Sequence, residues 1–181
     1  MTGSTSPARS VAFIDLPGEE PLPTTIDGAR FRQVLGRFAT GVTVITGVAG
    51  GEPVGLAVNS FTSVSLEPAL VAFCVAEESR TWPKLRSAGD FCVNILAEDQ
   101  EALSRAFAGR PPDRFLGVGW RPGRSGAPIL ADVLAWIECT IETEHDAGDH
   151  VIVVGRVQEL DVGHEGRPLV FYRGGYGRFE P

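Results

Sequence analysis

Hydroxyl and amide side chains are concentrated in one short segment, Asn59-Ser60-Phe61-Thr62-Ser63-Val64-Ser65. The segment falls inside a strand that we expect over residues 53–66, and it puts polar groups on both faces of that strand. Buried hydroxyl and amide groups need hydrogen-bond partners, so such a strand can hold a flat heteroaromatic ring or a sugar-alcohol chain. The alternative is an edge strand whose Ser and Thr side chains are solvated.

A second polar cluster comprises Ser79, Arg80, Thr81 and Lys84, at the start of a short helix expected over residues 81–88. Hydroxyl groups, a guanidinium and the chain's single lysine can together hold a phosphate group, and free N–H groups at a helix start favour the same ligand. The alternative is that Ser79 or Thr81 only caps the helix while the cations are solvated.

Two further groups could contact an aromatic ligand. Gly148, Asp149 and His150 form a hairpin at a strand entrance, where a lone histidine is equally consistent with a surface or packing role. Near the C-terminus Tyr172, Gly174 and Tyr176 combine aromatic faces with flexible backbone, although the two tyrosines could instead close a core.

Composition excludes several classes of protein. The chain has 181 residues, 16 Lys and Arg against 23 Asp and Glu, a net charge of −7, and no run of basic residues that would bind nucleic acid. Its longest apolar run, residues 69–76, is far short of the roughly 20 residues that cross a bilayer, so no membrane association is expected. No targeting segment is evident at the N-terminus, which predicts a cytoplasmic protein.

Cysteines and histidines show no metal-binding pattern. Cys74, Cys92 and Cys139 each lie in an apolar run and are expected to be buried and inert, and the three histidines lack ligand spacing, so we expect no metal. The chain also lacks both Gly-x-Gly-x-x-Gly after a strand and Gly-x-x-x-x-Gly-Lys-[Ser/Thr]. Any nucleotide must therefore be held in another way.

The elements that would position these groups are mainly strands. Residues 1–26 predict a flexible arm, and the domain is expected over residues 27–181. A helix capped by Asp27 and ending near Thr40-Gly41 carries an apolar stripe that should pack against another surface. Strands are expected near residues 42–46, 53–66, 69–76, 91–96, 137–142, 151–160 and 169–172, with a helix over 98–108 and a long loop over 109–128.

This order of elements predicts a mostly antiparallel β fold closed into a barrel, with two or three flanking helices. Ile137, Cys139 and Ile141 alternate with Glu138, Thr140 and Glu142, which predicts a half-exposed strand. A doubly wound parallel fold is disfavoured because strands and helices do not alternate regularly.

Two more segments join the four groups described above, namely Phe38-Ala39-Thr40-Gly41-Val42-Thr43-Val44-Ile45-Thr46 and Phe91-x-Val93-Asn94-Ile95-Leu96. In this order the six segments resemble the short-chain flavin reductase family, the reductase components of two-component flavin-dependent monooxygenases. The resemblance extends from about Phe31 to Phe179. It implies an FMN-binding split barrel of Greek-key type.

The resemblance also implies a reaction. In the family, NADH or NADPH delivers a hydride from nicotinamide C4 to N5 of FMN or FAD, and the reduced flavin diffuses to a separate oxygenase. It implies a homodimer, and it assigns His150 to orienting the nicotinamide. The flavin-binding residues that the resemblance implies are Thr40, Gly41, Val42, the whole Asn59–Ser65 segment, Ser79 and Thr81. The residues that it places near the nicotinamide are Gly148, Asp149, His150, Tyr172, Gly174 and Tyr176. Arg80 and Lys84 are candidate neighbours of the phosphate on physical grounds only.

Two other functions share the same architecture. One is a flavin-binding module without catalysis, and the other is a flavoenzyme resembling pyridoxamine-phosphate oxidase. The choices between FMN and FAD, between NADH and NADPH, and between bound and diffusible flavin stay open at the level of the sequence.

Overall fold

The computed structural model describes residues 25–109 and 113–180. It contains three helices, α1 (Gly28–Leu35), α2 (Trp82–Ala88) and α3 (Glu101–Ala108). The strands are β1 (Thr40–Gly41), β2 (Thr43–Ala49), β3 (Glu52–Val58), β4 (Thr62–Leu66), β5 (Ala69–Ala76), β6 (Asp90–Ile95), β7 (Trp120–Pro122), β8 (Pro128–Leu130), β9 (Ala135–Ala147), β10 (His150–Val162), β11 (Leu169–Tyr172) and β12 (Gly175–Arg178). Residues 1–24, most of the predicted arm, lie outside the described part.

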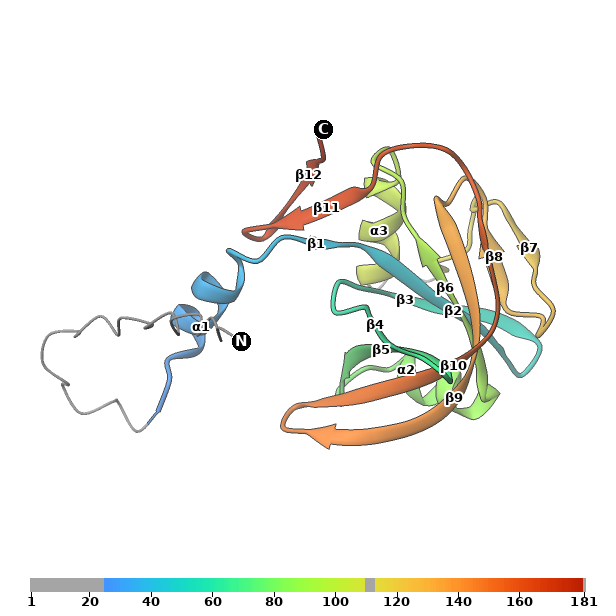
Figure 1. The fold of residues 1–181 in the computed structure, drawn as a ribbon, viewed down its shortest axis with the longest axis horizontal. Helices are drawn as coiled ribbons and strands as arrows, with labels where there is room; N and C mark the ends of the chain where they lie inside the picture. The colour runs from blue at the N-terminus through green and yellow to red at the C-terminus, as the bar shows by residue number, and fades with distance from the viewer. Residues whose placement is uncertain (1–24, 110–112, 181) are drawn as a thin grey trace, which may run out of the picture.

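A seven-stranded sheet in the order β3-β2-β6-β9-β10-β5-β4 forms the body of the fold, and every strand pair is antiparallel. The sheet curls strongly (Figure 1), which agrees with the predicted barrel. The predicted closure of the barrel is wrong, because the edge strands β3 and β4 are not paired with each other. Two smaller sheets, β1-β11-β12 and β7-β8, flank it.

Alternate residues of the central strands serve two different cores. In β2, Ile45 packs with Phe73 and Phe91 in one cluster, whereas Val44 packs with Phe107 in the other. Both faces of β2 are therefore buried over residues 43–47. Trp82 and Leu85 of α2 belong to the first cluster, and Phe107 of α3 belongs to the second.

The single strand expected over residues 53–66 is wrong, because the chain leaves the ladder at Asn59 and returns as the edge strand β4. The Ser60 hydroxyl bonds to both backbone groups of Cys74, accepting from its N–H at 2.8 Å and donating to its carbonyl at 3.1 Å. A side chain thus replaces a neighbouring strand at this point of β5. The local sequence gives no sign of this, since the partner lies 14 residues away.

Other boundaries differ for local reasons. Helix α1 begins at the predicted cap, where the Asp27 carboxylate accepts from the N–H groups of Ala29 and Arg30 at 3.3 and 3.0 Å, but it ends at Leu35, not near Thr40. Helix α3 begins at Glu101 and not at residue 98, because the chain still runs beside the segment before β11 there: Ala97 forms a β-bridge with Pro168, and Glu98 N–H bonds to the carbonyl of Arg167 at 2.8 Å. The predicted loop 109–128 contains β7, and strand β12 was not predicted.

The predicted half-exposed character of β9 is wrong at Glu138, which is 2% exposed. Its carboxylate accepts from the N–H groups of Arg124 and Ser125 at 2.7 and 3.0 Å and from the Ser125 hydroxyl. The turn between β7 and β8 therefore covers a face that the alternation assigns to solvent.

Candidate functional site

A cavity of about 760 Å³ lies beside β3, between the end of β5, the start of α2 and the segment after α3. This volume falls within the roughly 300–1,000 Å³ of typical small-molecule sites. Apolar side chains, among them Leu56, Phe107 and Phe115, form part of the wall. The predicted site residues that line it are Asn59, Ser60, Ser79, Arg80, Thr81, Lys84 and His150.

The two hydroxyl groups at the start of α2 have different tasks. Ser79 Oγ accepts from the N–H of Trp82 at 3.1 Å and so caps the helix. Thr81, the N-cap residue by position, makes no capping bond with its side chain. Its hydroxyl instead accepts from the guanidinium of Arg114. The capping alternative therefore holds for Ser79 and fails for Thr81.

His150 lies at the start of β10, where it is paired with Ala76 of β5. Its Nδ1 is 2.7 Å from a carboxylate oxygen of Asp149, and this hydrogen bond and the histidine charge hold the pKa of Asp149 below its usual range. With Nδ1 engaged, Nε2 is the ring nitrogen available to a molecule in the cavity.

A smaller pocket of about 170 Å³ adjoins the cavity and shares Ala57, Val58, Asn59 and Ala108 with it. Tyr176 forms part of its wall. The Tyr176 hydroxyl bonds to Ser104 of α3 at 2.9 Å, and its ring packs edge-on against Phe171 with 5.4 Å between ring centres. The tyrosine therefore supports the pocket wall. The other residues lining the pocket are Val42, Ser104 and Phe171.

The polar groups of the cavity suit a flavin nucleotide. An amide and hydroxyl groups can bond to ring edges and sugar-alcohol oxygens, and Arg80 and Lys84 can face a phosphate. Apolar wall residues can cover an aromatic ring.

Comparisons with known proteins agree with this chemistry. Residues 35–180 match the family described as "Flavin reductase like domain". The chain belongs to the flavin reductase family. That assignment confirms the resemblance found in the sequence.

Individual relatives span nearly the whole flavin reductase domain. The reductase subunit HsaB of a flavin-dependent monooxygenase from Rhodococcus jostii (strain RHA1) is 50% identical over 156 residues, covering 86% of this chain and 80% of the relative. A flavin reductase from Pseudomonas putida is 47% identical, covering 88% and 95% of the two chains. The solved structure of the NADH:FAD oxidoreductase SgcE6 from Streptomyces globisporus C-1027, in complex with NAD and FAD fragments, superposes with a TM-score of 0.81 at 40% identity and covers 86% and 94% of the chains.

Several predicted site residues lie outside the large cavity of this flavin reductase. Thr40 and Gly41 form β1, where the buried Thr40 hydroxyl has no partner among the described residues. Thr62, Ser63 and Val64 are exposed on the edge strand β4, as the alternative interpretation of that segment expected. The remaining predicted residues that do not line the large cavity are Val42, Phe61, Ser65, Gly148, Asp149, Tyr172, Gly174 and Tyr176.

Arg114 and Glu78 line the cavity and were not predicted. Arg114 belongs to the 109–128 segment, whose length was the only signal in the sequence. Burial lowers the pKa of its guanidinium. Cys74, expected to be buried, is half-buried and also lines the cavity, whereas burial raises the pKa of both Cys92 and Cys139 to about 12.

Two further observations concern the described residues only. No three His, Cys, Asp or Glu side chains gather closely enough among them to hold a metal ion. None of the helices within residues 25–109 and 113–180 is long and apolar enough to span a membrane.

Proposed function

We propose that this chain is an NADH-dependent flavin reductase of the cytoplasm that supplies diffusible reduced flavin to a separate monooxygenase. The observation that carries the proposal is the cavity, which gathers seven predicted residues from separate segments of the chain into one site. Membership of the flavin reductase family and the monooxygenase named for the Rhodococcus relative support it.

The residues around the cavity bind and orient the two cofactors. Asn59 and the backbone near Ser60 face the flavin, and Thr81, Arg80 and Lys84 hold its phosphate. His150 orients the nicotinamide through Nε2, since Asp149 fixes the opposite ring nitrogen. The cofactors supply the chemistry, a hydride from nicotinamide C4 to flavin N5, so the protein needs no acid or base for that transfer.

The decisive experiment mixes the purified protein with NADH and FMN or FAD and follows the loss of nicotinamide absorbance. We expect turnover well above that of the protein-free mixture. A protein that binds flavin but does not oxidise NADH faster than the blank would instead be a flavin-binding module.

We favour NADH over NADPH because Glu78 lines the cavity, where its carboxylate would repel a 2′-phosphate and could accept a hydrogen bond from a ribose hydroxyl. The name of the Streptomyces relative, an NADH:FAD oxidoreductase, agrees with this preference. Initial rates with the four pairs of flavin and nicotinamide test it, and a higher kcat/KM with NADPH would overturn it.

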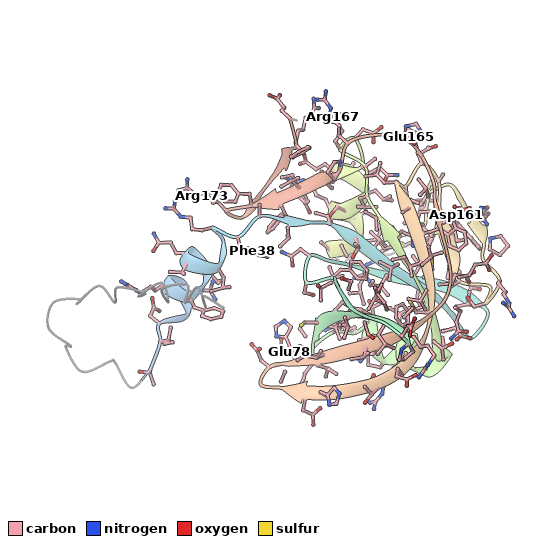
Figure 2. The ribbon with its side chains drawn as sticks, in the orientation of Figure 1. Phe38, Glu78, Asp161, Glu165, Arg167 and Arg173 are labelled. Carbon is pink, nitrogen blue, oxygen red and sulfur yellow. The ribbon has the colours of Figure 1, made fainter. Side chains whose placement is uncertain are left out.

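We also propose a homodimer. The apolar stripe of α1 consists of Phe31, Val34 and Leu35, continued by Phe38, and these side chains are between 50% and 74% exposed. Helix α1 projects from the barrel (Figure 1), and Phe38 lies in the stretch between α1 and β1 (Figure 2). A second copy of the chain would cover this stripe.

A further inference from the structure

We propose that Arg114 is a positioning residue that holds the Thr81 hydroxyl with its hydrogen directed at the phosphate of a bound flavin. The proposal rests on the proposed function, because it assigns a task to one side of the same cavity. It adds a residue that no pattern in the sequence indicates.

The first support is the geometry of the guanidinium. Arg114 Nη1 donates to the carbonyl of Gly55 in β3 at 2.8 Å and also to the Thr81 hydroxyl, and Nη2 donates to the carbonyl of Gly109 at 2.6 Å. These three oxygens come from β3, the residue before α2 and the residue after α3. One planar side chain thus joins the three elements that border the cavity.

The second support is the state of the Thr81 hydroxyl. A threonine hydroxyl has one hydrogen to donate and two lone pairs. Because Arg114 can only donate, Thr81 accepts from it, and the Thr81 hydrogen remains for another acceptor. Ser79 already caps α2, so the helix does not require Thr81 for that purpose. A phosphate oxygen in the cavity is a suitable acceptor.

The third support is charge. All three oxygens bonded to Arg114 are neutral, and no described carboxylate lies within ion-pair distance of it. A partly desolvated cation without a counterion is unfavourable, and an anion nearby relieves that cost. The flavin phosphate would supply the negative charge on the cavity side.

The test compares FMN with riboflavin, which has the same ring and sugar-alcohol chain but no phosphate. In Arg114→Lys the charge is kept, but an ammonium cannot bond in a fixed fork to oxygens of three elements. We expect the Kd for FMN to rise about tenfold, while the Kd for riboflavin changes less than twofold. Titrations by flavin fluorescence measure both values.

Two further variants separate positioning from folding. Arg86→Lys is the matched control, because Arg86 lies on α2 outside the cavity lining, where it is an exposed partner of Glu144 at 2.7 Å, and it should leave both Kd values unchanged. Thr81→Val should weaken FMN binding by a similar factor. The double variant Thr81→Val/Arg114→Lys should then lose little more FMN affinity than either single variant, because both substitutions disrupt the same pair of residues, Arg114 and the Thr81 hydroxyl that it holds.

The outcomes distinguish the two proposals. Equal losses of FMN and riboflavin affinity in Arg114→Lys, or fully additive losses in the double variant, would overturn the role of Arg114 and leave the flavin reductase proposal intact. Failure of the unaltered chain to bind either flavin would overturn both.

Discussion

The carboxylate of Glu138 holds the turn between β7 and β8 against β9. It bonds to two successive N–H groups and a hydroxyl of the turn at residues 124–125, and a Cβ at Gly123 would collide with it. Arg121, next to this turn, places its guanidinium 5.4 Å from the centre of the Trp136 ring. The β7–β8 hairpin is therefore attached to β9 through polar contacts as well as apolar ones.

Replacing Glu138 by Gln should destabilise the fold. The variant keeps the shape but turns charge-assisted hydrogen bonds into weaker neutral ones and places an NH₂ group beside backbone donors. We expect a loss of about 2 kcal/mol in the free energy of unfolding, measured by denaturant titration. Glu142→Gln on the same strand, which weakens an exposed ion pair with Arg156, is the control and should cost less, because exposed ion pairs contribute little to stability. Equal losses in both variants would contradict this account.

The contribution of Glu138 should also depend on pH. Burial raises the pKa of this carboxyl, but the Ser125 and Arg124 hydrogen bonds and the charge of Arg121 outweigh burial and lower it below its usual range. Because the folded pKa lies below the unfolded one, the stabilisation is complete above about pH 4.3 and is lost as the pH falls through the folded value. The difference in stability between the unaltered chain and Glu138→Gln should accordingly shrink in acid, and a constant difference from pH 7 to pH 3 would be inconsistent with it.

Glu138 and Arg114 share the reason why the sequence did not reveal them. Each depends on partners far along the chain, 14 residues away for Arg124 and 59 for Gly55, and the local pattern of each resembles a solvated charge. By contrast the sequence predicts Ser79 and Lys84, which line the cavity, because a helix start and its polar neighbours lie together in the chain.

At the scale of elements, Gly155 allows β10 to cross the core. A Cβ at this position would overlap the ring of Phe91, and the register between β10 and β9 shifts between Val154 and Gly155. The absence of a side chain thus leaves room for one of the fully buried aromatic rings.

Gly155→Ala should therefore lower the free energy of unfolding by about 1–3 kcal/mol, the usual cost of overpacking a core. Thermal or denaturant unfolding followed by circular dichroism measures the loss. Gly177→Ala is the control, because a Cβ there meets no atom within 4 Å. Similar behaviour of the two variants would refute the steric explanation.

Helix α2 provides a second prediction for an element. Ser79→Ala removes the oxygen that accepts from Trp82 N–H and should destabilise the protein by about 1 kcal/mol. Ser87→Ala, at the other end of the helix, removes a hydroxyl that only donates to the Lys84 carbonyl and should have a smaller effect. A larger loss for Ser87→Ala would show that Ser79 is not the cap.

Elements with uniform patterns were predicted well, and those completed by distant groups were not. The strand over residues 69–76 was predicted with its observed bounds, because apolar residues fill it and turn signals flank it. The sequence of residues 53–66 predicts one strand, because the break depends on Ser60 bonding to Cys74, 14 residues away. The sequence does not predict strand β12, because its Gly residues give no strand signal. In the structure Tyr176 of β12 pairs with Phe171 of β11.

At the scale of the whole molecule, the stripe on α1 sets the expected oligomeric state. The double variant Phe31→Glu/Phe38→Glu places two charges where a second copy would pack and should convert a dimer to a monomer in analytical ultracentrifugation. Gln33→Glu, on the same helix but outside the stripe, should leave the dimer intact. An unaltered chain that sediments as a monomer would overturn the dimer proposal.

The unpaired edges of the main sheet have a consequence for how the cavity can be entered. Because β3 and β4 do not pair with each other, and the Ser60 hydroxyl joins their connection to Cys74 of β5, separating β3 from β4 breaks no ladder hydrogen bond. Brief separation of the two edges would instead cost the apolar contacts of the core cluster that Leu56 and Val58 of β3 share with Val71 and Phe73 of β5, a part of the energy of complete unfolding. In deuterated water the amide hydrogen of Cys74 should exchange faster than those of neighbouring β5 residues paired with β10, and added flavin should slow that exchange.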